Sequence, residues 1–271
     1  MFVIKMIALD LDNTLLDSHK KISEANVAAL QRLHQQGLKI VLCTGRPLSA
    51  IHPYIAQLGL TAETDYTITF NGGLVVHNAT GEVLYQNGLH KTDFEPLYRY
   101  ATRRGLPLDI LDFNHNFQIK ELGPSLYTQT KRVGVDYLPV SFKELPDSLF
   151  STALISTTPA TLDTVNPQVS HDLFTTYHVV RSQPHMLEFL SPEVDKIVGI
   201  KALLARFNWD TSNLMTFGDA ENDFHMIQQA GEGVAMINGQ LDVKAVADHI
   251  TTKDNNESGV ADYLQRYFDL V

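Results

Sequence analysis

The sequence predicts an α/β fold in which a doubly wound parallel sheet carries an inserted α+β domain. Short apolar segments alternate with amphipathic segments at both ends of the chain, as expected when helices connect parallel strands. Between residues 85 and 189 this alternation gives way to short strands and helices in mixed order. Three of the apolar segments also end in polar residues of the kinds that bind ligands. These are Asp10 with Asp12, Thr44 with Gly45, and Gly218 with Asp219.

The N-terminal part of the chain has the order strand, helix, strand, helix, strand. The apolar run at residues 6–9 predicts a buried first strand that ends at Asp10. Ser23 is a typical N-cap residue and Gly37 a typical stop, so a helix is expected at residues 24–36. The remaining expectations are a strand at 38–43, a helix opened by Pro47 and ending near Leu58, a strand at 66–70, a turn at 71–73 and an extended segment at 74–77.

The middle of the chain is expected to form a separate unit, because its pattern is α+β and the strand–helix alternation resumes after it. We therefore predict a discontinuous core domain, residues 1–84 and 190–271, and an inserted domain, residues 85–189. Helices of the insert are expected at 93–104, 125–132 and 159–170, with strands at 106–113, 117–122, 151–156, 174–181 and 186–190. After the insert, helices are expected at 195–207, 224–230, 243–247 and 260–268, with strands at 213–217, 233–236 and 249–252.

Composition limits the kinds of partner. The chain has 271 residues, of which 44% are hydrophobic, and a formal net charge of -10, which argues against a nucleic-acid surface but permits a small anionic ligand. Its single cysteine, Cys43, excludes an internal disulfide framework. The sequence contains neither a signal-peptide pattern at its start nor an apolar run long enough to span a membrane. A cytoplasmic protein with no membrane partner is expected, and the oligomeric state stays open.

The acidic residues at the strand ends predict a metal site. The carboxyl ends of parallel strands meet at one edge of the sheet, where α/β proteins bind ligands. Carboxylates gathered there repel one another unless a cation lies among them, and Mg²⁺ prefers oxygen ligands. Taken alone, the segment from Asp10 to Thr14 is equally consistent with a polar turn after a strand. The carboxylates of Asp219 and Asp223, at the end of another expected strand, favour the metal site.

These motifs resemble those of a known enzyme family. The segments Asp10-Leu11-Asp12-Asn13-Thr14, Thr44-Gly45-Arg46, Lys196 and Gly218-Asp219-Ala220-Glu221-Asn222-Asp223 are similar to the four motifs of the haloacid dehalogenase superfamily. Their order and spacing resemble the Cof-type, YidA-like branch of sugar phosphatases over nearly the full chain. The resemblance implies a Rossmann-like core with an inserted cap domain of type C2. Asn13 and Ile197 stand where this family often has glycine.

The resemblance also implies roles for individual residues. Asp10 would be the nucleophile that forms an aspartyl-phosphate, and Asp12 would act as general acid and then as general base. Lys196 would neutralise a phosphoryl oxygen. The complete phosphate-binding set would be Leu11, Thr44, Gly45, Lys196 and Asn222, and the Mg²⁺ set would be Asp10, the backbone carbonyl of Asp12, Asp219 and Asp223.

The expected function is hydrolysis of small phosphorylated metabolites, above all sugar phosphates, with Mg²⁺ as cofactor. Alternatives are a phosphotransferase or phosphomutase that uses the same aspartyl-phosphate, and a phosphate-ligand sensor. We expect the insert to select the substrate. Arg46 is a candidate either for substrate contact or for pairing with an acid, and Asn71 with Gly72 either for a simple turn or for shaping the site. The candidates in the insert are Arg181, His185 and Glu188.

Overall fold

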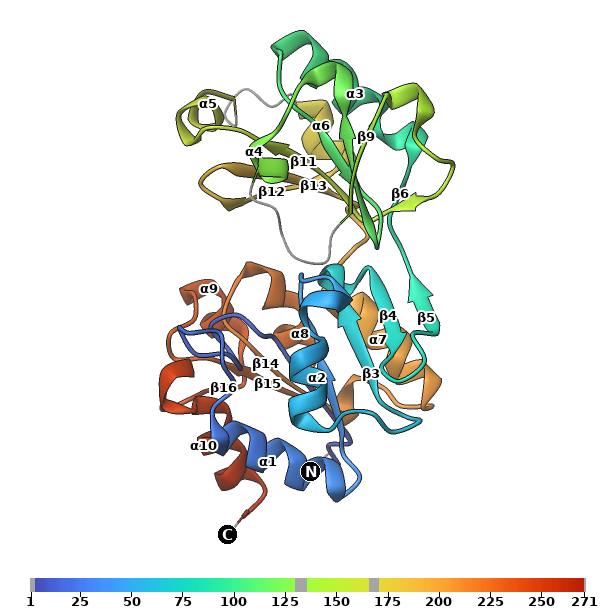
Figure 1. Ribbon diagram of the computed structural model, residues 1–271. Helices are drawn as coiled ribbons and strands as arrows, with labels where there is room; N and C mark the ends of the chain where they lie inside the picture. Colours follow the sequence, from blue (N-terminus) through green and yellow to red (C-terminus); the bar gives the residue numbers. More distant parts are fainter. Residues whose placement is uncertain (1–2, 130–135, 166–170, 271) are drawn as a thin grey trace. The chain divides into compact units, whose positions relative to one another are not determined.

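The computed structural model describes residues 3–129, 136–165 and 171–270. Over this part of the chain, two compact units can be distinguished: Met1–Gln86 with Asp195–Val271, and Asn87–Val194 (Figure 1). The first unit is therefore discontinuous in sequence, and it carries the four motifs identified above. No helix in the described residues is both long and apolar enough to cross a membrane.

The first unit is built on a parallel sheet. Among its described residues, five strands lie in the order β16-β15-β14-β1-β2. Strand β1 pairs in parallel with β14 on one side and with β2 on the other, so the switch point of the sheet lies between β1 and β14. The predicted doubly wound core is confirmed. The strands are β1 (Met6–Leu9), β2 (Lys39–Leu42), β14 (Leu214–Gly218), β15 (Glu232–Ala235) and β16 (His249–Ile250).

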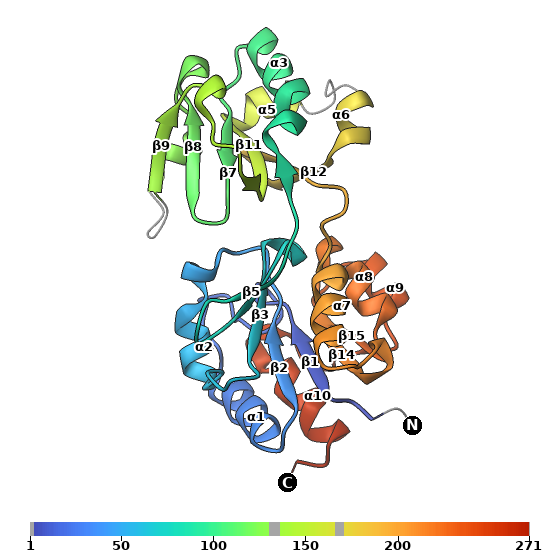
Figure 2. The ribbon, with the colours of Figure 1, turned by 90° about the vertical axis from the view of Figure 1, so that its right-hand side faces the viewer.

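Helices cover both faces of this sheet (Figure 2). Side chains alternate along β1, so Ile7 and Leu9 pack into one hydrophobic layer while Met6 and Ala8 pack into the other. Ser23 caps α1 as predicted, since its hydroxyl accepts a hydrogen bond from the Asn26 amide. The first layer contains α1 (Glu24–Gln35), α2 (His52–Leu58) and α10 (Gly259–Tyr267), and the second contains α7 (Lys196–Arg206), α8 (Phe224–Gln229) and α9 (Leu241–Val246).

Two expectations for the first unit are wrong. Pro47 does not open a helix: it precedes a 3-10 turn, η1 (Leu48–Ala50), and α2 begins only at His52. Strand β3 (Tyr66–Thr69) does not join the main sheet as a full strand. The chain reverses directly after it, so β3 pairs in the antiparallel sense with β4 (Leu74–His77), which pairs with β5 (Val83–Gln86). An isolated parallel bridge from Ile68 to Cys43 connects this small sheet to the end of β2.

The second unit has the α+β architecture that its sequence predicts. In its described part, six strands lie in the order β12-β13-β11-β7-β8-β9, with only the β8–β9 pair parallel. The helices α3 (Glu95–Arg104), α5 (Pro159–Val165) and α6 (His171–Thr176) contribute to one core with the sheet. The strands are β7 (Asp109–Leu111), β8 (His115–Ile119), β9 (Asp136–Val140), β11 (Thr152–Ser156), β12 (His178–Gln183) and β13 (Met186–Leu190), and a short pair is formed by β6 (Leu89–His90) and β10 (Leu149–Phe150).

Several boundaries in the second unit differ from the expectations. The predicted strand at 174–181 is wrong at its start, because Leu173 and Tyr177 are buried at helical spacing and α6 extends to Thr176. Strand β8 ends at Ile119, where a 3-10 turn replaces the rest of the predicted strand. The predicted helix at 125–132 corresponds to α4 (Leu126–Gln129). Residues 130–132 of that prediction lie outside the described residues, and so do residues 166–170 of the predicted helix at 159–170.

Candidate active site

The site lies where β1 and β14 end side by side. Leu9 is paired with Phe217, and the amide of the next residue, Asp10, donates a hydrogen bond of 3.0 Å to the Phe217 carbonyl. The Thr14 hydroxyl donates to Asp219 Oδ1 at 3.0 Å. The switch point of the sheet therefore brings the first and last motifs together, although more than 200 residues separate them in the sequence.

Three buried carboxylates form the centre of the site. Among the residues that the structure describes, Asp10, Asp219 and Asp223 offer carboxylate oxygens that all lie within 4.8 Å of one another. The donor set consists of oxygen atoms alone, which suits a hard divalent cation such as Mg²⁺. Charges this close inside a protein repel strongly. The residues present therefore fit a bound divalent cation.

Lys196 holds two of these carboxylates. Its fully buried ammonium lies 2.5 Å from Asp10 Oδ1 and 2.6 Å from Asp223 Oδ1. The other oxygen of Asp223 accepts the backbone amides of Asp219 at 2.9 Å and Ala220 at 3.0 Å. Burial opposes the charge on Lys196, but the carboxylates of Asp10 and Asp223 outweigh burial and raise its pKa. Asp223 thus fixes the backbone of the last motif and the position of Lys196.

Burial and the repulsion between carboxylates both oppose ionisation of Asp10 and Asp219. Burial raises the pKa of Asp10 to about 8; the charge of Lys196 lowers it only in part, and Asp223 raises it further. Burial, followed by the charge of Asp223, raises the pKa of Asp219 to about 6. A single ammonium does not balance three carboxylates, so the cluster favours a further cation.

Asp12 has different partners. Its carboxylate accepts hydrogen bonds from Arg46, with Nε at 2.7 Å and Nη2 at 2.5 Å, and from Lys20 Nζ at 2.6 Å. Burial raises the pKa of Asp12, but the hydrogen bonds from Arg46 and Lys20 outweigh burial and lower the pKa overall. Arg46 therefore pairs with an acid, which is one of the two alternatives that the sequence leaves open. Lys20 was not identified from the sequence, because only the folded turn brings it back to Asp12.

The second motif meets a turn that follows β3. Thr44 is buried, its hydroxyl accepts from the Arg46 amide at 3.2 Å, and its carbonyl accepts from the Asn71 amide at 3.0 Å. Asn222 donates from Nδ2 to Asn71 Oδ1 at 3.0 Å. Leu11, another of the predicted phosphate-binding residues, directly follows Asp10, and its side chain is fully buried. Its carbonyl accepts hydrogen bonds from the amides of Thr14 and Leu16.

The two departures from the family pattern are explained by local backbone geometry. Asn13 has a φ of 61°, a left-handed conformation that asparagine tolerates better than most residues and that glycine adopts freely. Ile197 lies in the first turn of α7, where its amide donates to the carboxylate of Asp195, the N-cap residue.

The three candidates in the insert lie on or between two neighbouring strands of the second unit: Arg181 on β12, His185 in the following turn and Glu188 on β13. Arg181 is held within this unit, since Nη1 lies 2.6 Å from Asp163 Oδ1 and Nη2 lies 2.6 Å from the Pro184 carbonyl. The His185 carbonyl accepts from the Thr157 amide at 3.1 Å. The structure thus groups these three residues in one hairpin of the second unit.

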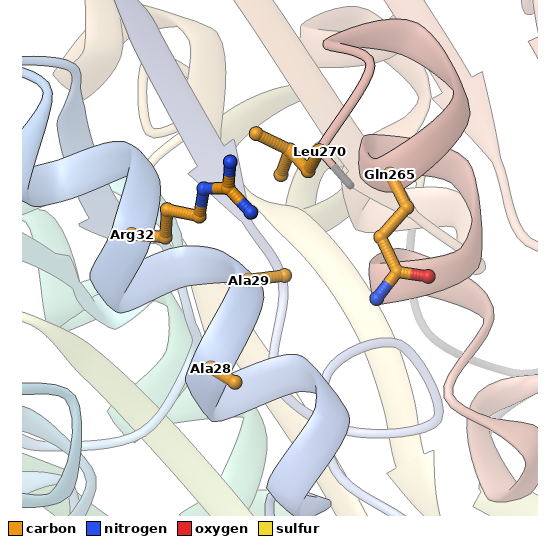
Figure 3. Close-up of a pocket in the computed structure, with 5 residues that line it drawn as sticks. All are labelled: Ala28, Ala29, Arg32, Gln265 and Leu270. Atoms are coloured by element: carbon orange, nitrogen blue, oxygen red, sulfur yellow. The ribbon is translucent and has the colours of Figure 1, made fainter.

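A small cavity of about 100 Å³ lies between α1 and α10 (Figure 3). None of its lining residues carries a carboxylate, thiol or imidazole, so the cavity offers no acid–base or metal chemistry. It is lined by Ala28, Ala29, Arg32, Gln265 and Leu270.

Comparison with known proteins extends these observations. A family model described as haloacid dehalogenase-like hydrolase matches residues 7–264. The chain is 33% identical over 269 residues to a Bacillus subtilis protein provisionally named phosphatase YxeH, covering 95% of this chain and 96% of that protein. It is 31% identical over 276 residues to the Bacillus subtilis 5-amino-6-(5-phospho-D-ribitylamino)uracil phosphatase YitU, covering 98% of each. A haloacid dehalogenase-like hydrolase from Bacteroides thetaiotaomicron is similar in structure, with a TM-score of 0.82 and 30% identity over 98% of this chain and 100% of that one.

Proposed function

The chain belongs to the haloacid dehalogenase-like hydrolases, in their Cof-type branch, and is a phosphatase; from this premise we propose that it hydrolyses sugar phosphates and similar small metabolites with Mg²⁺ through an aspartyl-phosphate on Asp10. The observation that carries the proposal is the position of Asp10. Its carboxylate lies at the end of β1, in contact with Lys196 and within the cluster of three buried carboxylates. A phosphorylated ribityl chain forms part of the substrate named for YitU, which supports a sugar-like substrate.

In the first step Asp10 attacks the phosphorus atom of the ester. Lys196 donates a hydrogen bond to Oδ1 of Asp10. We therefore assign the attack on phosphorus to Oδ2. The new bond joins Oδ2 to phosphorus, and the bond from phosphorus to the alcohol oxygen breaks. A carboxylate is suited to this step because it needs no deprotonation at neutral pH once a cation stabilises its charged form.

Asp12 then moves the protons. As general acid it gives a proton to the leaving alcohol oxygen, and as general base it takes one from the water that attacks phosphorus and frees Asp10. Its pairing with Arg46 and Lys20 favours the ionised form, which fits the role of base. To act as an acid, Asp12 has to gain a proton and release at least part of this pairing.

The remaining residues of the motifs hold the phosphoryl group. We assign its oxygens to Lys196, the Thr44 hydroxyl, the Gly45 amide and Asn222, with the backbone of Leu11 beside them, because positioning and charge neutralisation carry most of phosphoryl transfer. Bound Mg²⁺ would supply positive charge to the transferring phosphoryl group. The residues that would hold it are Asp10, the backbone carbonyl of Asp12, Asp219 and Asp223.

Substrate selection is assigned to the second unit, through the hairpin that carries Arg181, His185 and Glu188. This hairpin combines a cation, an imidazole and a carboxylate, which together can bind hydroxyl groups of a polyol. Arg181 is partly committed to Asp163, so its substitution would also break an ion pair within the unit. Glu188→Gln is expected to change the ratio of the kcat/KM values for two sugar phosphates, as the loss of a selective hydrogen bond to substrate would. Hydrolysis of p-nitrophenyl phosphate is expected to stay within about twofold of the wild-type rate.

The proposal is tested by a screen of phosphate esters with Mg²⁺ on the wild type and on Asp10→Asn. The wild type is expected to release inorganic phosphate at a rate independent of added sugar acceptor, whereas a phosphotransferase would need the acceptor. Asp10→Asn is expected to lose activity and keep its far-UV circular dichroism. Full activity in this variant would remove Asp10 from the mechanism.

A further inference from the structure

The turn after β3 has an unusual backbone. Phe70, Asn71 and Gly72 follow one another with φ values of 50°, 54° and 97°, three consecutive left-handed residues. Such a conformation is costly for a bulky residue such as phenylalanine, and it persists only where surrounding contacts impose it. Backbone strain of this kind tends to lie at functional sites. The contacts of this turn therefore matter.

On one side the turn contacts the second motif. The Asn71 amide donates to the Thr44 carbonyl at 3.0 Å, and the Thr44 amide donates to the Ile68 carbonyl at 3.0 Å. A Cβ atom added to Gly45 would lie 3.0 Å from both Nδ2 and Oδ1 of Asn71. The carboxamide of Asn71 therefore lies directly against the backbone of Gly45, and a larger residue at position 45 would displace it.

On the other side the turn contacts the third and fourth motifs. Asn222 donates to Asn71 Oδ1 at 3.0 Å. A Cβ atom on Gly72 would lie 2.0 Å from the Asp195 carbonyl and 2.9 Å from the Lys196 amide, so this glycine is packed against the start of α7. A single three-residue turn thus contacts the backbone of Thr44 and Gly45, the side chain of Asn222 and the residues that begin the helix of Lys196.

We propose that Asn71 is a positioning residue for the transferred phosphoryl group: its carboxamide sets the Gly45 amide and the Asn222 side chain relative to each other so that both bind the same phosphate. This inference rests on the proposed function, which gives Gly45 and Asn222 to the phosphate. Asn71 acts through these two groups. Its Oδ1 accepts from Asn222, which fixes that side chain beside the Gly45 backbone.

The charge of position 71 follows from this role. A neutral carboxamide beside Gly45 can accept from Asn222 and adds no charge next to the phosphate. Aspartate has nearly the same shape, tolerates the left-handed conformation and can still accept from Asn222, but it places a negative charge where phosphate binds. Asn71→Asp therefore separates a role in phosphate binding from a role in forming the turn.

The experiment is a double-mutant cycle with inorganic phosphate as the probe. The inhibition constant of phosphate and the KM for p-nitrophenyl phosphate are measured with Mg²⁺ for the wild type, Asn71→Gly, Asn222→Ala and the double variant. Glycine keeps the left-handed backbone at position 71 and removes only the side chain. Each single variant is expected to weaken phosphate inhibition about tenfold, as for one hydrogen bond to a charged group. The double variant is also expected to lose about tenfold rather than a hundredfold, because the two side chains act as a unit.

Two further variants complete the test. Asn71→Asp is expected to weaken phosphate inhibition at least as much as Asn71→Gly while its thermal unfolding stays near that of the wild type. Asn208→Gly is the control, since Asn208 also has a left-handed φ, 56°, but lies in the turn after α7; it is expected to leave phosphate inhibition unchanged.

The outcomes separate the inference from the proposed function. A wild type that neither releases phosphate from esters nor is inhibited by phosphate overturns both. Additive losses in the cycle, or normal phosphate inhibition in Asn71→Asp, overturn the inference alone and leave Asn71 as part of an ordinary turn.

Discussion

The two units bury polar groups in different ways. In the first unit the ammonium of Lys196 lies between the carboxylates of Asp10 and Asp223. In the second unit Asp109, at the start of β7, is fully buried, and neither of its carboxylate oxygens has a hydrogen-bond partner of standard geometry. Both amide atoms of Asn116, on the neighbouring strand, also lack one. Among the described residues, no ion pair involves Asp109.

The difference shows what each arrangement can do. Burial raises the pKa of Asp109 to about 6, and Ser125 and Asn116 lower it only in part, so burial without a cation disfavours the charged form of this carboxyl group. The cluster of the first unit keeps charge inside the protein with the help of Lys196 and still has an excess of carboxylates. Only the first arrangement can attract a divalent cation and carry out phosphoryl transfer.

The largest effect is expected from removing the Lys196 ammonium, because this leaves the buried carboxylates of the first unit, like Asp109 in the second, without a cation. Lys196→Met leaves Asp10 and Asp223 buried without their cation, which is expected to destabilise the first unit by about 3–5 kcal/mol. Phosphatase activity is expected to fall by a factor on the order of 10³, because charge neutralisation at the phosphoryl group is lost. Denaturant unfolding and steady-state kinetics measure the two effects.

The matched control is Lys201→Met, on the same helix but exposed, where Nζ donates to Gln229. It should change neither quantity measurably. Activity within threefold of the wild type in Lys196→Met would contradict the charge balance described for the cluster.

Metal removal should affect the first unit alone. We expect a chelator to abolish activity reversibly and Mg²⁺ to restore it. At a concentration about 100 times the dissociation constant, Mg²⁺ should stabilise the first unit by about 2.7 kcal/mol. Thermal unfolding with and without Mg²⁺ measures this shift.

Asp219→Asn should lose most of the stabilisation by Mg²⁺, and Asp109→Asn should retain it. An equal shift in both variants would mean that the metal does not bind at the carboxylates of the first unit.

The smallest effect is expected at Asp109. Folding raises its pKa to about 6, so its contribution to stability is complete below the pKa of the unfolded chain, near 4, and is lost as the pH rises through 6. Between pH 5 and pH 8 the second unit should lose on the order of 1 kcal/mol. Asp109→Asn should remove this dependence.

Hydrogen exchange of peptides from β7 and β8 at the two pH values measures the change within the second unit. Protection that falls with pH to the same degree in Asp109→Asn and in the wild type would show that another group is responsible.

The sequence predicts the sheet of the first unit and the residues at its carboxyl edge because both follow from local patterns. Asp10 and Asp219 directly follow short buried strands, and parallel strands bring such positions to the same edge. The pairing of Asp12 with Lys20 could not be predicted, because it depends on how a turn folds back. Nor could the contact between Asn71 and Asn222, which are 151 residues apart.

The second unit is less predictable for physical reasons. Strand β9 contains Pro139 and an exposed Leu138, and neither feature predicts a strand from the local sequence. The strand forms because it pairs in parallel with β8. The buried Asp109 could not be predicted either, since an isolated aspartate in a sequence normally indicates exposure. Both features are imposed by tertiary packing.

The most direct measurement of the central claim is chemical trapping at Asp10. The protein with Mg²⁺ is mixed with p-nitrophenyl phosphate, quenched with acid and reduced with borohydride, which converts an aspartyl-phosphate into homoserine. Peptide mass spectrometry is expected to find homoserine at position 10 in the wild type, but neither without substrate nor in Asp10→Asn. Active wild-type protein with homoserine at another position, or at none, would contradict the assignment of Asp10 as the nucleophile.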